Sequence, residues 1–242
     1  MHQAALILSA IVALLVPRMA FAQANLPRAY MLDMKVDPED VPGWIENYRD
    51  HATAILEAMV EDGALLAFDL WVRHTGGEHN LRYNYVLPDF EAVAEAGGRY
   101  MERMDPASMA AFGQLAATLR ESSDGIWYIG DSNLPDDRPL APYVYESAYQ
   151  IEAASRERWN ADFERSARPA LERAMEVGLI SAWARLDHSI GGPWNTKTLL
   201  WMTSWAAIED VLELLDQPAT AAGSIVLDRS DTIWTPVPPS GS

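Results

Sequence analysis

The chain of 242 residues contains no cysteine. Disulfide bonds, thiolate metal ligands, cysteine nucleophiles and a lipid anchor on an N-terminal cysteine are therefore excluded. Basic residues are scarce as well, because 18 lysines and arginines stand against 35 aspartates and glutamates, which gives a formal net charge of −17. Such a charge repels phosphate groups, so we expect no nucleic-acid partner. Phosphate-binding glycine loops, dinucleotide fingerprints, nucleophile elbows and zinc-protease motifs are also absent.

Only one long hydrophobic run is present, at residues 4–16, and it is too short to span a bilayer. The small-x-small sequence Ala20-Phe21-Ala22 follows it, as is typical of a signal-peptide cleavage site. We therefore expect residues 1–22 to be a signal peptide and the mature protein to be periplasmic or secreted, without stable membrane anchoring after cleavage. The alternative is an uncleaved N-terminal anchor. A cysteine-free exported chain fits the bacterial periplasm, where disulfides are not obligatory.

The chain contains an internal repeat. Residues 30–95 reappear 115 positions later without a gap. Identical residues at this offset include Tyr30 and Tyr145, Trp44 and Trp159, Gly63 and Gly178, Ala67 and Ala182, and Asn80 and Asn195. After a short deletion, residues 124–127 correspond to residues 231–234. The sequence therefore predicts two copies of one fold in tandem.

Each copy has the sequence pattern of a strand, a helix, two strands, a helix and a strand. In the first copy Asp37-Pro38 begins a helix and Gly63 ends it, while Gly76-Gly77 forms a hairpin turn. In the second copy Pro169 is expected to bend the long helix of residues 155–176. Asn80 and Asn195 follow the Gly-Gly turns and are expected to shape the hairpins through side-chain to backbone hydrogen bonds.

The order β-α-β-β-α-β is that of the ferredoxin-like motif. Doubled in one chain, it resembles the dimeric α/β-barrel superfamily, in which two such sheets pack face to face around a cavity. The resemblance implies an α+β fold in which two tandem ferredoxin-like repeats form an intrachain pseudodimer. The expected organisation is a signal peptide (1–22), a first repeat (23–132), a linker (133–142), a second repeat (143–234) and a disordered tail (235–242). The tandem already supplies the pairing that single-copy relatives obtain by dimerising, so the oligomeric state stays open.

One predicted strand of the second copy carries a candidate ligand site. Trp183, Arg185 and Asp187 alternate along it, so their side chains point to one side. We expect that side to face the cavity between the sheets, with Trp183 as a stacking surface and Arg185, oriented by Asp187, contacting an anionic or carbonyl group. Tyr145 and Tyr149 complete the expected ligand-binding set. The alternative is an ordinary ion pair at the strand end.

The opposite side of the same strands carries Ala67 and Ala182, whose small size suits close contact with a helix. Three histidines lie in the hairpin loops, His74, His79 and His188. Histidines with carboxylates can bind zinc, and the resemblance allows a haem ligand. Because these histidines do not correspond in the repeat, we expect solvated turns, no metal site and no cofactor.

Three functions fit these observations. The first is an exported small-molecule-binding protein whose cavity accepts a small apolar or aromatic ligand, since nine tryptophans and nine tyrosines must fill cores, line a cavity or cover an interface. The second is a cofactor-independent monooxygenase-like enzyme acting on an aromatic substrate. The third is a structural or assembly protein without a small-molecule site. The superfamily also includes haem-dependent chlorite dismutase relatives and muconolactone isomerases, so the fold does not choose among these functions.

Overall fold

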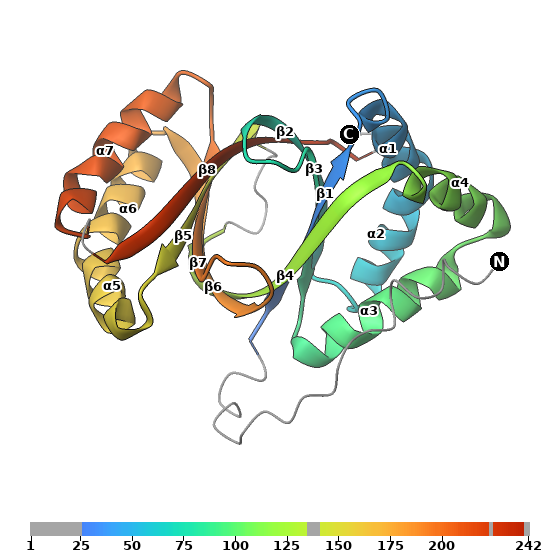
Figure 1. The fold of residues 1–242 in the computed structure, drawn as a ribbon, viewed down its shortest axis with the longest axis horizontal. Coiled ribbons are helices and arrows are strands. Elements are labelled where there is room, and N and C mark those ends of the chain that lie inside the picture. The colour runs from blue at the N-terminus through green and yellow to red at the C-terminus, as the bar shows by residue number, and fades with distance from the viewer. Residues whose placement is uncertain (1–25, 135–140, 223–224, 240–242) are drawn as a thin grey trace. The chain divides into compact units, whose positions relative to one another are not determined.

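The computed structural model describes residues 26–134, 141–222 and 225–239 of the chain (Figure 1). The expected signal peptide lies outside the described residues, and so do residues 135–140 of the expected linker. None of the helices in the described segments is long and apolar enough to cross a membrane.

The first half of the chain follows the expected order of elements, with a second helix pair before its last strand. Its elements are β1 (Arg28–Val36), α1 (Val41–Asn47), a π-helical turn (Tyr48–Ala52), α2 (Thr53–Glu61), β2 (Ala67–Gly76), β3 (Leu81–Leu87), α3 (Phe90–Arg103), α4 (Pro106–Ala116) and β4 (Leu119–Asn133). The side chains of Asp89 and Asp105 accept backbone N–H groups at the N-termini of α3 and α4, which satisfies donors that a helix start leaves unpaired.

The second half repeats this order with one helix in place of α3 and α4. Its elements are β5 (Tyr143–Ile151), a 3₁₀ turn (Ala153–Ser155), α5 (Arg156–Asp162), a π-helical turn (Phe163–Ala167), α6 (Arg168–Glu176), β6 (Ile180–Ile190), β7 (Thr196–Met202), α7 (Ala207–Ala222) and β8 (Val226–Pro236). In Figure 1 α5, α6 and α7 lie on one face of the sheet that contains β5 to β8.

The eight strands are hydrogen-bonded in the order β1-β3-β2-β8-β5-β7-β6-β4, which closes as an antiparallel barrel. The chain forms two compact units. Among the described residues, the first contains residues 26–70, 79–124 and 238–239, and the second contains residues 71–78, 125–134, 141–222 and 225–237. The second unit therefore includes the end of β2, which pairs with β8, and the end of β4, which pairs with β6.

The two halves share local geometry at an offset of 115 residues. Arg28 pairs with Leu87 in the first half, and their counterparts Tyr143 and Met202 pair in the second. The two π-helical turns, residues 48–52 and 163–167, also correspond. Neither turn contains a proline, so the widened helix in both halves does not depend on one. The bend that we expected from Pro169 is instead a π-helical turn that ends before this residue, which occupies the first turn of α6.

Asparagine side chains bond to backbone groups, as predicted, but the bonds lie at the end of the first strand in each half and not within the hairpin turns. The carboxamide of Asn80 accepts the N–H of Val36 at 3.0 Å and donates to its carbonyl at 2.8 Å. Asn195 makes the same two bonds to Ile151, at 2.9 and 2.6 Å. These bonds join neighbouring strands, whereas the turns themselves are formed by glycines with positive φ.

The C-terminal strand is longer than the sequence predicted. Residues 235 and 236, assigned to a disordered tail, belong to β8 and pair with Val72 and Trp71. The side chain of Val237 is buried as well. Strand β8 therefore ends two residues later than expected, because its last two residues pair with β2.

Candidate ligand-binding site

The helix-covered face of the second unit's sheet carries its side chains in three rows across four strands. Residues that pair across antiparallel strands stand directly opposite each other, so the pairing register defines each row. From β8 through β5 and β7 to β6, the rows are Arg229, Tyr149, Thr196 and Asp187, then Asp231, Ser147, Thr198 and Arg185, then Ile233, Tyr145, Leu200 and Trp183. The first two rows are called the polar rows below. Their members Ser147, Thr196 and Arg185 are buried, where a sheet face is normally apolar, whereas Arg229 and Asp231 of β8 are exposed.

All five residues of the predicted site lie on this face, but the face is not the one we expected. Phe163 in the π-helical turn packs against Trp183 with ring centroids 6.0 Å apart, and Asn160 of α5 accepts a hydrogen bond from Arg185. The expectation that this side looks away from the helices is therefore wrong. Ala182, expected beneath a helix, pairs with Trp201 on the other face. Both faces of the strand are buried, so alternation alone could not tell them apart.

The guanidinium of Arg185 is held from several directions. Its Nη2 donates to both carboxylate oxygens of Asp187 at 3.2 Å and to the carboxamide of Asn160. Its plane lies over Phe163, with Cζ 4.9 Å from the ring centroid. Arg156 of α5 donates to the same Asp187 at 3.2 Å, so the carboxylate is shared by two cations. The ion pair predicted between Arg185 and Asp187 is present, and it orients a side chain that is only 5% exposed.

Several donors beneath the helices have no acceptor. Arg185 Nε and the indole Nε1 atoms of Trp183 and Trp159 are buried and make no hydrogen bond within the described part of the chain. Leaving a buried donor unpaired costs about 1–3 kcal/mol. Arg185 and Trp183 both contact Phe163, so two of these donors flank one aromatic ring. An entering oxygen acceptor would satisfy them.

The other end of the polar rows is internally paired. The Tyr145 hydroxyl donates to Asp231 Oδ1 at 2.9 Å, and the Ser147 hydroxyl donates to the same oxygen at 2.6 Å. Arg229 donates to Asp231 and to the Tyr145 oxygen, both at 3.0 Å, and its Cζ lies 5.6 Å from the ring centroid of Tyr149. Burial, followed by the charge of Asp231, raises the pKa of Tyr145 to about 12, so this phenol stays a neutral donor.

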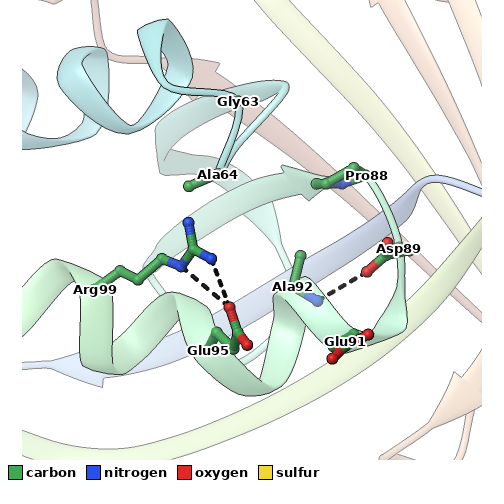
Figure 2. A pocket seen from close by; sticks show the side chains of 8 residues that line it. All are labelled: Gly63, Ala64, Pro88, Asp89, Glu91, Ala92, Glu95 and Arg99. Carbon is green, nitrogen blue, oxygen red and sulfur yellow. Dashed lines mark hydrogen bonds and ion pairs between the residues drawn. The ribbon is translucent and has the colours of Figure 1, made fainter.

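A pocket of about 320 Å³ lies in the first unit (Figure 2). It is lined by Gly63, Ala64, Pro88, Asp89, Glu91, Ala92, Glu95 and Arg99. Its polar groups serve the helix that carries them, because Asp89 caps the N–H of Ala92 at 2.8 Å and Glu95 pairs with Arg99 at 2.6 Å. This arrangement stabilises α3 and leaves few groups to bind a ligand.

The three histidines make separate contacts, and His74 and His188 lie in β2 and β6 rather than in the predicted hairpin loops. Within the described residues, no three histidine, aspartate or glutamate side chains gather closely enough to hold a metal ion. The ring of His188 contacts the Gly191 carbonyl and lies edge-on to Trp127, while His74 packs against Trp205 at 4.6 Å. His79 Nε2 is buried without a partner, but no histidine stands in the polar rows. Among the described residues, the polar rows therefore contain no histidine that could serve as an axial haem ligand.

Comparison with known proteins places this geometry in a fold group. No family model and no curated protein matches the chain. Among solved structures, a proposed monooxygenase from Fusobacterium nucleatum matches with a TM-score of 0.67 and 6% sequence identity, covering 88% of this chain and 93% of that chain. A proposed monooxygenase from Lactobacillus acidophilus matches with a TM-score of 0.60 and 9% identity, covering 88% of this chain and 95% of that chain. A haem-binding protein from Thermus thermophilus matches with a TM-score of 0.56 and 10% identity, covering 87% of this chain and 91% of that chain. The chain has the dimeric α/β-barrel fold. At such low identities the likeness concerns the fold alone.

Sequence reasoning about this α/β-barrel protein missed the residues that complete the site. Asn160 and Phe163 come from the helix side, and their positions follow only from the packing of α5 and the π-helical turn on the sheet. Asp231 had a signal, because the repeat aligns it with Asp124. Arg229 stands two residues earlier on the same strand, and therefore on the same face as Asp231.

Proposed function

We propose that this chain is a small-molecule-binding protein whose ligand site lies beneath α5 and the following π-helical turn, against the polar rows of the second unit. The ligand class that fits is an aromatic compound carrying a carboxylate or carbonyl group. Trp183 and Phe163 offer ring surfaces, and Arg185 Nε and Trp183 Nε1 offer donors to oxygen atoms. The observation that carries the proposal is the pair of buried donors without acceptors on one side of one strand.

The proposed site lies within one unit and does not use the cavity between sheets that the sequence led us to expect. Its residues are close enough to act together, since Arg185 contacts Asn160, Asp187 and Phe163 directly. We also infer that the two halves arose from one ferredoxin-like unit and form an intrachain pseudodimer. The shared pairing register, the paired π-helical turns and the equivalent asparagine bonds support this inference.

The apolar run and Ala20-Phe21-Ala22 support export to the periplasm or the medium, with cleavage after residue 22. Amino-terminal sequencing of exported protein should find a start near Gln23. A start far from this residue, or retention of the chain in the membrane fraction, would contradict the export proposal without affecting the ligand site.

Ligand binding can be tested by tryptophan fluorescence with a panel of aromatic carboxylates and their neutral carbonyl analogues. Arg185→Leu should preserve the fold and weaken binding of the retained compounds by about 1.5–3 kcal/mol, the range for a hydrogen bond to a charged group. Arg173→Leu, an exposed arginine on α6, is the matched control and should bind as the original chain does. Oxygen uptake with the same panel distinguishes simple binding from monooxygenase-like turnover. If Arg185→Leu binds every retained compound with unchanged affinity, the site assignment is wrong.

A further inference from the structure

The helix-covered face of the first unit contains four tyrosines in a continuous row. Tyr30 stacks on Tyr85 with centroids 6.2 Å apart, Tyr85 on Tyr83 at 6.0 Å, and Tyr83 lies 6.0 Å from Tyr48. We call these four residues the tyrosine chain. The planes of Tyr83 and Tyr85 are parallel and those of Tyr30 and Tyr85 nearly so. Each ring therefore adjoins the next along β1, β3 and the π-helical turn.

The two ends of the tyrosine chain differ in their surroundings. At one end Tyr48 is 1% exposed, and Trp44, which is 2% exposed, lies edge-on to Tyr83 at 6.5 Å. At the other end Tyr30 is half-buried and its hydroxyl donates to Oδ2 of the exposed Asp124 at 3.0 Å. The row thus leads from buried rings to a phenol that has a carboxylate acceptor at the surface.

Packing alone does not require tyrosine at these positions. In the second half, Tyr85, Tyr83 and Tyr48 are replaced by Leu200, Thr198 and Phe163, and the same strands and π-helical turn form. Burying phenol groups is unfavourable compared with burying phenylalanine rings, and burial raises the pKa of both Tyr83 and Tyr85. The terminal pair, by contrast, is kept in both halves as Tyr30 with Asp124 and Tyr145 with Asp231.

We propose that the tyrosine chain carries one-electron oxidation from the buried rings to Tyr30. A one-electron oxidant, such as an oxygen-derived radical or a high-potential metal complex, removes an electron from Tyr48 or Trp44. The electron vacancy passes along Tyr83 and Tyr85 to Tyr30, and each inner ring regains its electron from the next. Tyr30 then loses its phenolic proton to Asp124 and becomes a neutral radical. A small phenol or an ascorbate-type reductant restores it by supplying an electron, and the proton returns from Asp124.

The absence of cysteine makes a site-specific test direct. A ruthenium polypyridyl complex is attached to Glu57→Cys, because Glu57 is exposed on α2, the helix that follows the π-helical turn of Tyr48, and its charge contributes to the raised pKa of Tyr48. Illumination with persulfate generates the oxidant at the buried end of the chain. A nitroso spin trap, followed by electron paramagnetic resonance and peptide mass spectrometry, should locate the radical adduct at Tyr30.

Tyr85→Leu copies the residue of the second half and should abolish the Tyr30 adduct, as should Tyr85→Phe, which keeps the shape of the ring. Asp124→Asn should lower the yield of the neutral Tyr30 radical, because the carboxylate acceptor is lost. Tyr143→Phe, outside the tyrosine chain, is the control and should leave the yield unchanged. An unchanged Tyr30 adduct in both Tyr85 variants, or no tyrosyl radical in the labelled original chain, would overturn the proposal.

Discussion

The helix-covered faces of the two halves have the same register and different chemistry. At positions related by 115 residues, Leu32, Tyr83 and Leu70 of the first half stand in place of Ser147, Thr198 and Arg185 of the second. The next positions are Met34, Leu81 and Val72 in place of Tyr149, Thr196 and Asp187. Since apolar and aromatic side chains suffice to pack helices on this sheet in the first half, the fold does not need the polar rows. The polar character of these positions therefore distinguishes the second half from the first.

The opposite faces of the two sheets show a second contrast. Each carries a buried ion pair, Arg82 with Asp33 in the first half and Lys197 with Glu146 in the second. Arg82 and Lys197 correspond in the repeat, but the two carboxylates do not, because Asp33 aligns with Ala148 and Glu146 with Met31. Both halves thus have a cation at this position, and the carboxylate lies at a different position on the first strand of each half. Each half therefore has a buried ion pair on this face, with the carboxylate at a different position.

The largest effect is expected when the more deeply buried ion pair is broken. Lys197→Met removes the ammonium group that lies 3.0 Å from the carboxylate of Glu146, whose side chain is 5% exposed, and should lower the free energy of unfolding by about 3–5 kcal/mol. Arg82→Met should cost less, because the Asp33 side chain is 17% exposed and water can solvate it. Urea unfolding of both variants measures the difference.

The double variant Lys197→Met with Glu146→Leu is the control for this prediction. It removes both charges and should recover most of the lost stability, since an apolar pair of similar volume often replaces a buried ion pair without loss. A larger loss for Arg82→Met than for Lys197→Met would show that exposure of the carboxylate does not set the cost.

The sequence predicted those parts of the fold that depend on local chemistry. Gly63 and Gly178 end their helices with the same positive φ, as expected of residues without a Cβ atom. The polar and aromatic character of one strand face, with Trp183, Arg185 and Asp187, was also visible from alternation. What the sequence could not decide was the direction of that face, because both sides of β6 are buried and either could have met the helices.

Other features of the molecule depend on contacts between distant segments. The pairing of residues 235 and 236 with β2 has no local signal, since the segment reads as a proline-rich tail. The contact of Asn160 with Arg185 likewise depends on how α5 lies across the sheet. The tyrosine chain is distributed over β1, β3 and the π-helical turn, and it becomes evident only when the strand register is known.

A smaller and equal effect in the two halves is expected from the asparagine bonds. Asn195→Ala removes both side-chain bonds to Ile151, and Asn80→Ala removes the matching bonds to Val36. Each variant should lose about 1–3 kcal/mol of stability, because backbone groups are left unpaired. Gln114→Ala on the exposed side of α4 is the control. A large difference between the free energies of unfolding that the two asparagine variants lose, measured in urea, would contradict the local equivalence of the halves.

The smallest effect concerns the corresponding phenols Tyr145 and Tyr30 at alkaline pH. Burial, with the charge of Asp231, raises the pKa of Tyr145 from 10.0 to about 12, and burial together with Asp124 raises the pKa of Tyr30 further. Between pH 10 and about pH 12 the unfolded chain releases phenolic protons that the folded chain retains, so the folded state binds more protons. Stability should therefore fall as the pH rises from 10 towards 12. Urea midpoints across this range should fall less steeply for Tyr145→Phe, and phenolate absorbance should reveal Tyr145 ionising before Tyr30. Ionisation of Tyr30 first would reverse the expected order of the two halves.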